Sequence, residues 1–280
     1  MNIQEAIEQG KKILIENNIK SAKLDSEILM SKVLQKDRKY IILNFDKELK
    51  RQNFLLFKEL VFKRSLGKPV AYLTGKKDFW NYNFVISEQT LIPRPDTEIL
   101  IENILKITKH KTRLNILDIG IGSGCILLSI LKEKKNFYGT GIDISKKCIE
   151  ISKINALKLK LLNRLKFFKT DVDNFFYGKY DLIISNPPYI NKLDLKNLDK
   201  DVIDFEPKIA LDGGLDGTSE IKKVIDRSSD LVKKNGKLVL EIAFGQKHKV
   251  KKLLKNKGFY INRIIKDYAK NDRCIISTKI

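Results

Sequence analysis

The stretch NILDIGIGSG, Asn115 to Gly124, decides the fold, because a short apolar run passes directly into three closely spaced glycines. Residues 114–119 have the apolar, β-branched character of a buried strand, and residues 125–134 have the spacing of a helix. A glycine-rich turn between a strand and a helix lets a ligand approach the backbone where a side chain would obstruct it. The stretch therefore predicts an α/β domain with a ligand-binding loop.

Outward from this unit, the alternation of strand and helix continues. We expect strands at 137–142, 165–169, 181–185 and 237–243, and helices at 96–108, 145–157 and 218–233. Such alternation is typical of a parallel sheet with helices on both faces. The last expected strands, 259–267 and 274–280, have no helix between them, so an antiparallel pair should close the sheet.

The N-terminal part has a different pattern. Apolar residues between positions 2 and 66 recur at three- and four-residue spacing, which predicts several short helices and no strand. Residues 76–86 alternate aromatic and polar side chains, which suits a hairpin. We therefore expect a small helical domain at 1–74, a connecting hairpin at 75–93 and a larger domain at 94–280.

The composition is that of a globular protein with a large excess of positive charge. The chain has 280 residues, 42% hydrophobic and 32% charged, which excludes wholesale disorder. The formal net charge of +21 favours an anionic partner such as nucleic acid or a membrane surface. However, the excess is mostly scattered lysine, and the arginines are dispersed. We therefore favour compositional drift with a solvated lysine surface over a dedicated nucleic-acid face.

Cysteine usage and the N-terminus indicate the compartment. Cys125, Cys148 and Cys274 are odd in number and lack CxxC spacing, so we expect neither a disulfide framework nor a metal site. The N-terminus, MNIQEAIEQGKK, has no apolar signal-peptide core, and no stretch resembles a membrane span. We therefore expect a cytoplasmic protein.

The glycine loop and two aspartates after later strands predict a nucleoside site. The GxGxG spacing differs from GxGxxG, and no Gly-Lys-Ser/Thr follows, so a P-loop is disfavoured. Asp118 suits a cationic ligand, and Asp143 can accept hydrogen bonds from both ribose hydroxyls unless it only caps the next helix. Asp171, with Val172 beside it, is placed to contact an adenine or else only closes a turn. The expected loop contacts are Asp118, Gly120, Ile121, Gly122, Ser123 and Gly124.

The stretch Asn186-Pro187-Pro188-Tyr189 follows a buried strand directly and ends it, because prolines donate no backbone N–H. A planar NH2 group presents two N–H donors. The Asn186 side-chain oxygen and the Pro187 carbonyl can accept one each, while Tyr189 packs on the face of the group. If this strand and the glycine-loop strand are neighbours where the sheet reverses its winding, the NH2 group and the nucleoside ligand meet in one crevice.

Together these three stretches resemble class I S-adenosylmethionine-dependent methyltransferases, which have a Rossmann-like, mostly parallel seven-stranded sheet with an antiparallel last strand. Further blocks resemble the release factor glutamine methyltransferases of the HemK/PrmC family over nearly the whole chain. These blocks are PVAYLTG at 69–75, IPRPDTE at 92–98, NPPYI at 186–190, FEP at 205–207 and GGLDG at 213–217.

The resemblance implies methylation of the glutamine side chain in the Gly-Gly-Gln motif of class-1 peptide chain release factors, with S-adenosylhomocysteine as the other product. The helical domain would grip the release factor; neither a membrane nor an obligatory nucleic acid is implied. Ile121 stands where the family more often has threonine, and Ala243 also departs from the family pattern, so we expect altered packing there. IPRPDTE can also be a stiffened helix start, with Asp96 as its cap and Glu98 near its N-terminal dipole.

Three rival functions share parts of this pattern. A ribosomal-protein glutamine methyltransferase would use the same chemistry. An adenine N6 methyltransferase of DNA or RNA shares Asn-Pro-Pro-Tyr, but it would need a target-recognition domain and a flipped base. A non-enzymatic, basic nucleic-acid-binding module would explain the charge but not the presence of all the expected cofactor and amide contacts.

Overall fold

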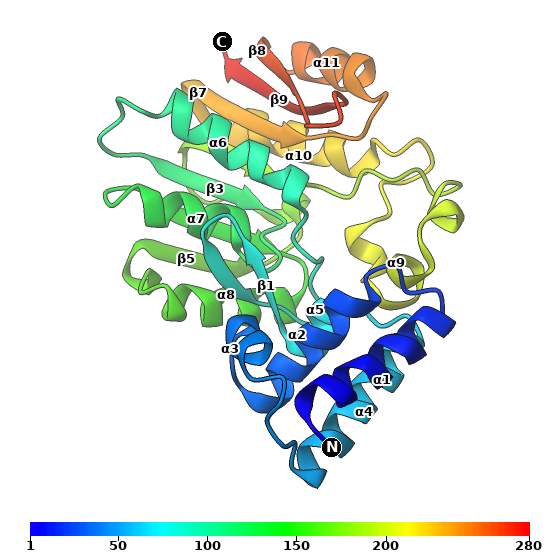
Figure 1. Cartoon of the computed structure of the whole chain (residues 1–280). Helices are drawn as coiled ribbons and strands as arrows, with labels where there is room; N and C mark the ends of the chain where they lie inside the picture. The colour runs from blue at the N-terminus through cyan, green and yellow to red at the C-terminus, as the bar shows by residue number, and fades with distance from the viewer. The chain divides into compact units, whose positions relative to one another are not determined.

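A seven-stranded sheet forms the centre of the larger of two compact units in this computed structural model, which describes all 280 residues. The strand order is β5-β4-β3-β6-β7-β9-β8 (Figure 1). The strands are β3 (Asn115–Ile119), β4 (Tyr138–Asp143), β5 (Leu165–Lys169), β6 (Tyr180–Ser185), β7 (Val232–Glu241), β8 (Phe259–Lys266) and β9 (Asp272–Lys279). Only β9 runs antiparallel to its neighbours, β7 and β8. The expected mostly parallel sheet with an antiparallel last strand is confirmed.

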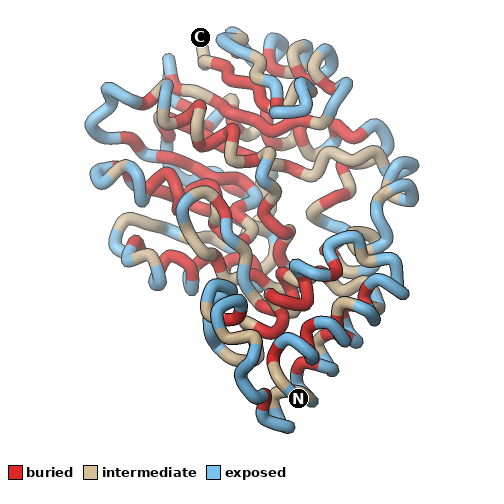
Figure 2. Tube along the Cα trace, in the orientation of Figure 1, coloured by how far each residue is buried: buried red, intermediate tan, exposed pale blue.

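Helices cover both faces of this sheet, and each face has its own apolar core. The alternation of strand side chains sends Ile116 and Leu182 to one core, and Leu117 and Ile183 to the other. The first core is covered by α6 (Glu98–Ile107), α7 (Cys125–Glu133) and α8 (Lys146–Lys158), and the second by α10 (Ser219–Leu231) and α11 (Lys247–Asn256). Figure 2 shows that buried residues run along the strands of this unit.

The reversal point of the sheet lies between β3 and β6. Strand β3 pairs in parallel with β4 on one side and with β6 on the other. In this register Ile119, at the end of β3, lies opposite both Ile142 and Ser185. The glycine loop, Asp143 and Asn186 therefore leave the sheet at the same edge, as the sequence predicted for adjacent strands.

The second unit is helical and comprises Met1–Lys76 together with Asp199–Phe205. Its helices are α1 (Ile3–Glu16), α2 (Ala22–Leu34), α3 (Arg38–Leu43), α4 (Arg51–Ser65), α5 (Val70–Thr74) and α9 (Lys200–Phe205). Asn2 and Glu5 form a reciprocal capping box at the start of α1. A nearly buried ion pair joins Arg64 to Asp25 at 2.7 Å and ties α4 to α2. The expected N-terminal helical region is confirmed.

Several local expectations differ from the structure. The hairpin is present as β1 (Lys76–Phe79) and β2 (Tyr82–Val85), but α11 was not expected. Strand β7 begins at Val232, earlier than the expected 237. Asp96 does not cap a helix, because Pro95–Thr97 forms a 3-10 turn that places Asp96 inside it. None of the helices combines the length and the apolar character needed to cross a membrane.

Candidate active site

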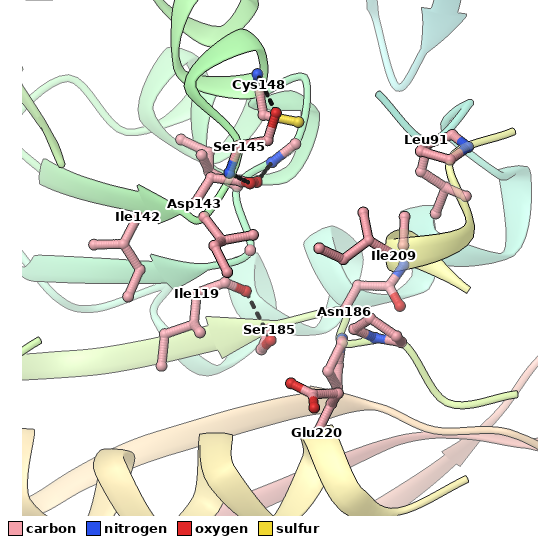
Figure 3. Close-up of a pocket in the computed structure, with 18 of the residues that line it drawn as sticks. Leu91, Ile119, Ile142, Asp143, Ser145, Cys148, Ser185, Asn186, Ile209 and Glu220 are labelled. Atoms are coloured by element: carbon pink, nitrogen blue, oxygen red, sulfur yellow. Dashed lines mark hydrogen bonds between the residues drawn. The ribbon is translucent and has the colours of Figure 1, made fainter. Parts of the chain in front are cut away.

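A cavity of about 590 Å3 opens at the carboxyl ends of β3, β4 and β6, the expected ligand position in an open α/β sheet. Figure 3 shows Asp143, from the end of β4, and Asn186, which follows β6, on its wall. Of the predicted site residues, Gly120, Ile121, Gly122, Ser123, Asp143, Asp171, Val172, Asn186, Pro187 and Pro188 line the cavity. The remaining three, Asp118, Gly124 and Tyr189, lie outside its wall.

The glycine loop has a backbone that side chains would strain. The φ angles of Gly120, Gly122 and Gly124 are +75°, +56° and +82°. No atom lies within 4 Å of the position that a Cβ on Gly120 would occupy, so the Gly120 backbone adjoins the open cavity. Ile121, the departure from the family pattern, packs over Gly141, where a Cβ would lie only 2.2 Å from the Ile121 Cδ1. The branched side chain at 121 therefore fits because residue 141 is glycine.

Asp143 braces the loop and keeps acceptor capacity for a ligand. Its Oδ2 accepts a hydrogen bond from the Gly122 N–H at 2.9 Å, and its Oδ1 accepts one from the Ser145 N–H at 2.8 Å. Ser145 itself caps α8 through the Cys148 N–H, so the alternative interpretation of Asp143 as the helix cap is wrong. Burial raises the pKa of Asp143, and the two backbone hydrogen bonds oppose this. Each carboxylate oxygen can still accept a second hydrogen bond.

Asp118 lies under the glycine loop and is only 1% exposed. Burial raises its pKa to about 7, and a hydrogen bond from the Leu127 backbone opposes the rise. Its Oδ2 has no hydrogen-bond partner. An unpaired carboxylate oxygen in such a place is costly unless a positive group lies nearby. The structure therefore places a buried carboxyl, whose charged form is disfavoured by burial, at the base of the loop and outside the cavity wall.

Asp171 closes a turn, one of the two roles that the sequence left open, and it also lines the cavity. Its Oδ1 accepts a hydrogen bond from the Asp173 N–H at 2.9 Å and thereby closes a 3-10 turn, and its side chain also lines the cavity. Val172 and Ile144 add apolar wall nearby, and Ile144 is 45% exposed although it is a large apolar residue. Ile144 was not predicted; its signal is an apolar residue directly after the strand-end Asp143.

The amide nitrogen and the amide oxygen of Asn186 have different surroundings. Its Nδ2 donates a hydrogen bond to the Thr97 hydroxyl at 3.4 Å, whereas its Oδ1 has no partner within the protein. Tyr189, predicted to pack on the ligand, instead donates from its hydroxyl to Glu241 Oε1 at 3.2 Å. Burial raises the pKa of the Tyr189 phenol, and the neighbouring Glu241 carboxylate adds to the rise. Asn186 thus presents a free acceptor, and Tyr189 lies behind the wall.

A buried carboxylate organises these polar groups. Glu241, the last residue of β7, is 1% exposed, and its Oε2 has no well-formed hydrogen bond. Burial raises its pKa to about 7, while hydrogen bonding by Thr97, the charge of Arg273 and the Tyr189 hydroxyl oppose the rise. We call Asn186, Thr97, Glu241, Tyr189 and Arg273 the Glu241 network. Its members come from four separate stretches of the chain.

A second ion pair fixes two segments of the wall. Glu206 has a side chain that is 1% exposed, and it accepts from the Arg94 guanidinium through Oε1 and from the Ile92 N–H through Oε2 at 3.3 Å. Only Glu206 is buried, since the Arg94 side chain is 38% exposed, so loss of Arg94 would leave a buried carboxylate without its cation. The pair joins the IPRPDTE stretch to the segment that continues into Pro207. Neither His110 nor His248 lines the cavity.

The whole chain is similar to known proteins. Residues 5–75 match the protein family described as PrmC N-terminal domain, and residues 93–262 match the one described as Methyltransferase small domain. A release factor glutamine methyltransferase from Buchnera aphidicola subsp. Schizaphis graminum is 37% identical over 279 residues, covering 100% of both chains. A protein of the same name from Clostridium acetobutylicum is 35% identical over 282 residues, covering 100% of this chain and 99% of the other.

A solved structure shares the fold at low sequence identity. The ribosomal protein L11 methylase from Lactobacillus delbrueckii subsp. bulgaricus has a TM-score of 0.52 and 16% identity. The similarity covers 73% of this chain and 90% of that one. At this identity the likeness shows the fold alone.

Proposed function

The chain belongs to the release factor glutamine methyltransferase family, and on this premise we propose that it methylates the side-chain amide nitrogen of the glutamine in the Gly-Gly-Gln motif of class-1 peptide chain release factors. The observation that carries the proposal is the free acceptor of Asn186, on the same cavity wall as Asp143 and the glycine loop. A nucleoside and a planar amide can be held there together.

The residues present fit S-adenosylmethionine as the methyl donor. Asp143 has spare acceptors for two ribose hydroxyls, Ile144 and Val172 give apolar wall for an adenine, and Gly120 leaves room beside its backbone. When bound, this cofactor supplies a methyl group activated by a sulfonium charge, and S-adenosylhomocysteine remains. The buried carboxyl of Asp118 adds negative potential below the loop, which favours a cationic ligand.

Asn186 and Pro187 would hold the glutamine amide. The Asn186 Oδ1 and the Pro187 carbonyl can each accept one N–H of the amide, which fixes the direction of its nitrogen. An amide nitrogen is a poor nucleophile because its lone pair is delocalised. Two acceptors draw electron density onto this nitrogen, and proximity and orientation supply much of the rate. The amide proton can leave after transfer, so the chemistry needs no histidine base.

Glu241 supports this role by deciding which way the Asn186 amide faces. The Thr97 hydroxyl is close enough to lower the pKa of Glu241, and a carboxylate only accepts, so in this proposal the hydroxyl proton turns toward Glu241. The Thr97 oxygen is then left to accept from the Asn186 Nδ2, which turns the Asn186 Oδ1 toward the cavity. Thr97 and Glu241 are positioning residues in this scheme, since they act through Asn186.

The helical unit is the proposed release-factor grip. Three large apolar side chains lie at helical spacing along and just after α4, namely Leu55, Phe62 and Leu66, and each is more than half exposed. We call them the α4 stripe. Exposed apolar groups of this kind suit a protein partner better than a nucleic acid. We place the enzyme in the cytoplasm, where release factors act, and assign it no obligatory nucleic acid.

The test is methyl transfer from labelled S-adenosylmethionine to purified release factor, to its Gln→Ala variant, to ribosomal proteins and to DNA. Asn186→Ala enzyme is run in parallel. We expect label on the release factor alone, and loss of label with either variant. Label on the Gln→Ala factor, on ribosomal protein or on DNA would contradict the proposed acceptor.

A further inference from the structure

A second pocket of about 470 Å3 lies at the opposite ends of the same strands. The first residues of four parallel strands, β3, β4, β5 and β6, line it; they are Asn115, Tyr138, Leu165 and Tyr180. The proposed methyl-transfer site lies at the carboxyl ends of these strands, so the length of the sheet separates the two. None of the residues assigned to methyl transfer lines this second pocket.

The pocket is lined by four cations and by no aspartate or glutamate. Two of the cations have structural roles, since Arg164 donates to main-chain oxygens at the end of α7 and Lys179 donates to the Asp230 carbonyl. Such contacts are expected where helix carboxyl ends lie. The other two, Arg113 and Lys166, have no carboxylate partner. Their positive charge is therefore available to an anionic ligand.

Tyrosine rings hold these two cations in place. The Arg113 guanidinium lies over the Tyr138 ring, 4.9 Å from its centroid, and the Lys166 Nζ donates to the Tyr177 hydroxyl at 2.8 Å. The strand register places Tyr138 and Lys166 on one face of the sheet, because Thr140, two residues after Tyr138, pairs with Lys166. Each cation therefore stands beside an aromatic surface.

Tyr177 provides a supported flat surface. Its ring packs against Phe168 with centroids 5.4 Å apart, yet the residue remains 51% exposed. The Lys166 Nζ lies over the same ring, 5.1 Å from its centroid, so a planar group would stack on the part of the ring that remains exposed beside this cation. Phosphate beside a cation and a base on an aromatic ring are the two halves of nucleotide recognition.

We propose that this pocket binds a nucleotide unit, with its phosphate near Arg113 and Lys166 and its base stacked on Tyr177. The nucleotide can be free or can belong to a single RNA strand, and the net charge of +21 would draw either toward the protein. Arg113 and Lys166 contact tyrosines and not helix ends, so the attraction of cations to helix carboxyl ends does not explain their presence in the pocket.

The experiment measures binding of a fluorescein-labelled oligouridylate to the full chain by anisotropy, over a series of salt concentrations, with UMP and inorganic phosphate as competitors. The test variants are Arg113→Ala/Lys166→Ala and Tyr177→Ser. Their matched controls are Lys252→Ala/Lys255→Ala on α11 and Tyr260→Ser on β8, which remove the same charge or the same kind of exposed ring. Methyl transfer to release factor, measured on every variant, reports that the fold is intact.

We expect both test variants to weaken oligouridylate binding about fivefold or more, while the controls change little. Tyr177→Ser removes stacking on one aromatic ring, which is worth at least that much, and Arg113→Ala/Lys166→Ala removes the two cations proposed to contact the phosphate. UMP should compete better than inorganic phosphate. If oligouridylate binds much more tightly than UMP and its affinity falls steeply with salt, the ligand is a single strand. If the two bind with equal affinity, the ligand is a free nucleotide. Equal losses in the test and control variants, or no binding of either probe, would overturn the proposal.

Discussion

The side-chain amide of Asn186 donates to the hydroxyl of Thr97 across 3.4 Å, although 89 residues separate the two in sequence. This contact leaves the Asn186 Oδ1 as the free acceptor on the cavity wall. The orientation of one amide thus depends on a hydroxyl from the IPRPDTE stretch.

Replacing Thr97 by valine should lower kcat about tenfold and leave the KM for S-adenosylmethionine near its normal value. Valine cannot accept from the Asn186 Nδ2, so the amide loses its fixed direction, while the cofactor contacts are unchanged. Steady-state kinetics with release factor as the substrate measure kcat and the KM for S-adenosylmethionine separately. Thr97→Ser keeps the hydroxyl and should restore most of the rate; a serine variant as slow as the valine variant would refute the hydrogen-bond explanation.

The rate of methyl transfer should rise with pH through about 7. The pKa of Glu241 is raised to about 7, and the orientation of Asn186 requires the ionised carboxylate, so activity is lost as pH falls below this value. The charged groups that face Glu241 are Arg273 and Asp96. Glu241→Gln should be slower and nearly independent of pH between 6 and 8. The idea fails if Glu241→Gln retains the wild-type pH profile while Asp118→Asn loses it.

Asp143→Asn should weaken binding of S-adenosylmethionine about tenfold or more, because a hydrogen bond to a charged acceptor is worth roughly 1.5–3 kcal/mol. Asp171→Asn should have a smaller effect, since one Asp171 oxygen already closes a turn. Isothermal titration calorimetry gives both values, and thermal melting without ligand checks the fold. Equal losses for the two variants would mean that Asp143 has no special contact with the ligand.

The free energy of unfolding of Asp118→Asn, relative to that of the wild type, should be larger at pH 8 than at pH 5. The folded-state pKa of Asp118, about 7, is above its ordinary value, so its stabilising contribution is complete at low pH and is lost as pH rises through 7. Between pH 5 and 8 the wild type should lose about 3 kcal/mol that the variant keeps, because the loss accrues at about 1.4 kcal/mol per pH unit between pH 5 and the folded-state pKa. Urea unfolding at both pH values measures this; an equal difference between the two chains at both would count against it.

Phe62→Ser should raise the KM for intact release factor about tenfold without changing kcat, as expected for an aromatic anchor at an interface. A short peptide that contains Gly-Gly-Gln should be methylated by both enzymes at the same rate, because it lacks the rest of the release factor, which is the proposed partner of the α4 stripe. Leu157→Ser, which removes an equally exposed apolar side chain from α8, is the control. If the KM for the peptide also rises, Phe62 stabilises the folded enzyme and does not contact the release factor.

Local sequence patterns predicted most of the sheet and the cavity wall. The glycines of the loop and the prolines of the Asn-Pro-Pro-Tyr stretch determine the backbone conformation locally, so the positions of both stretches at strand ends could be inferred. The Glu241 network could not be inferred, because its contacts depend on how distant segments pack. Burial of Glu241 and displacement of Tyr189 from the wall are properties of the folded chain. Helix α11 has only two buried positions, Val250 and Leu254, among many lysines, so its apolar periodicity is too weak to predict a helix.

The segment Asp199–Phe205 belongs to the helical unit, although the residues on both sides of it belong to the larger one. Phe205 lies close to Gly67, where a Cβ would be 3.5 Å from the Phe205 ring. A chimera made by exchanging only residues 1–76 between two relatives would therefore join helices of one lineage to an α9 of the other. A single genetic crossover cannot transfer this unit whole, so its two pieces must change together as sequences diverge.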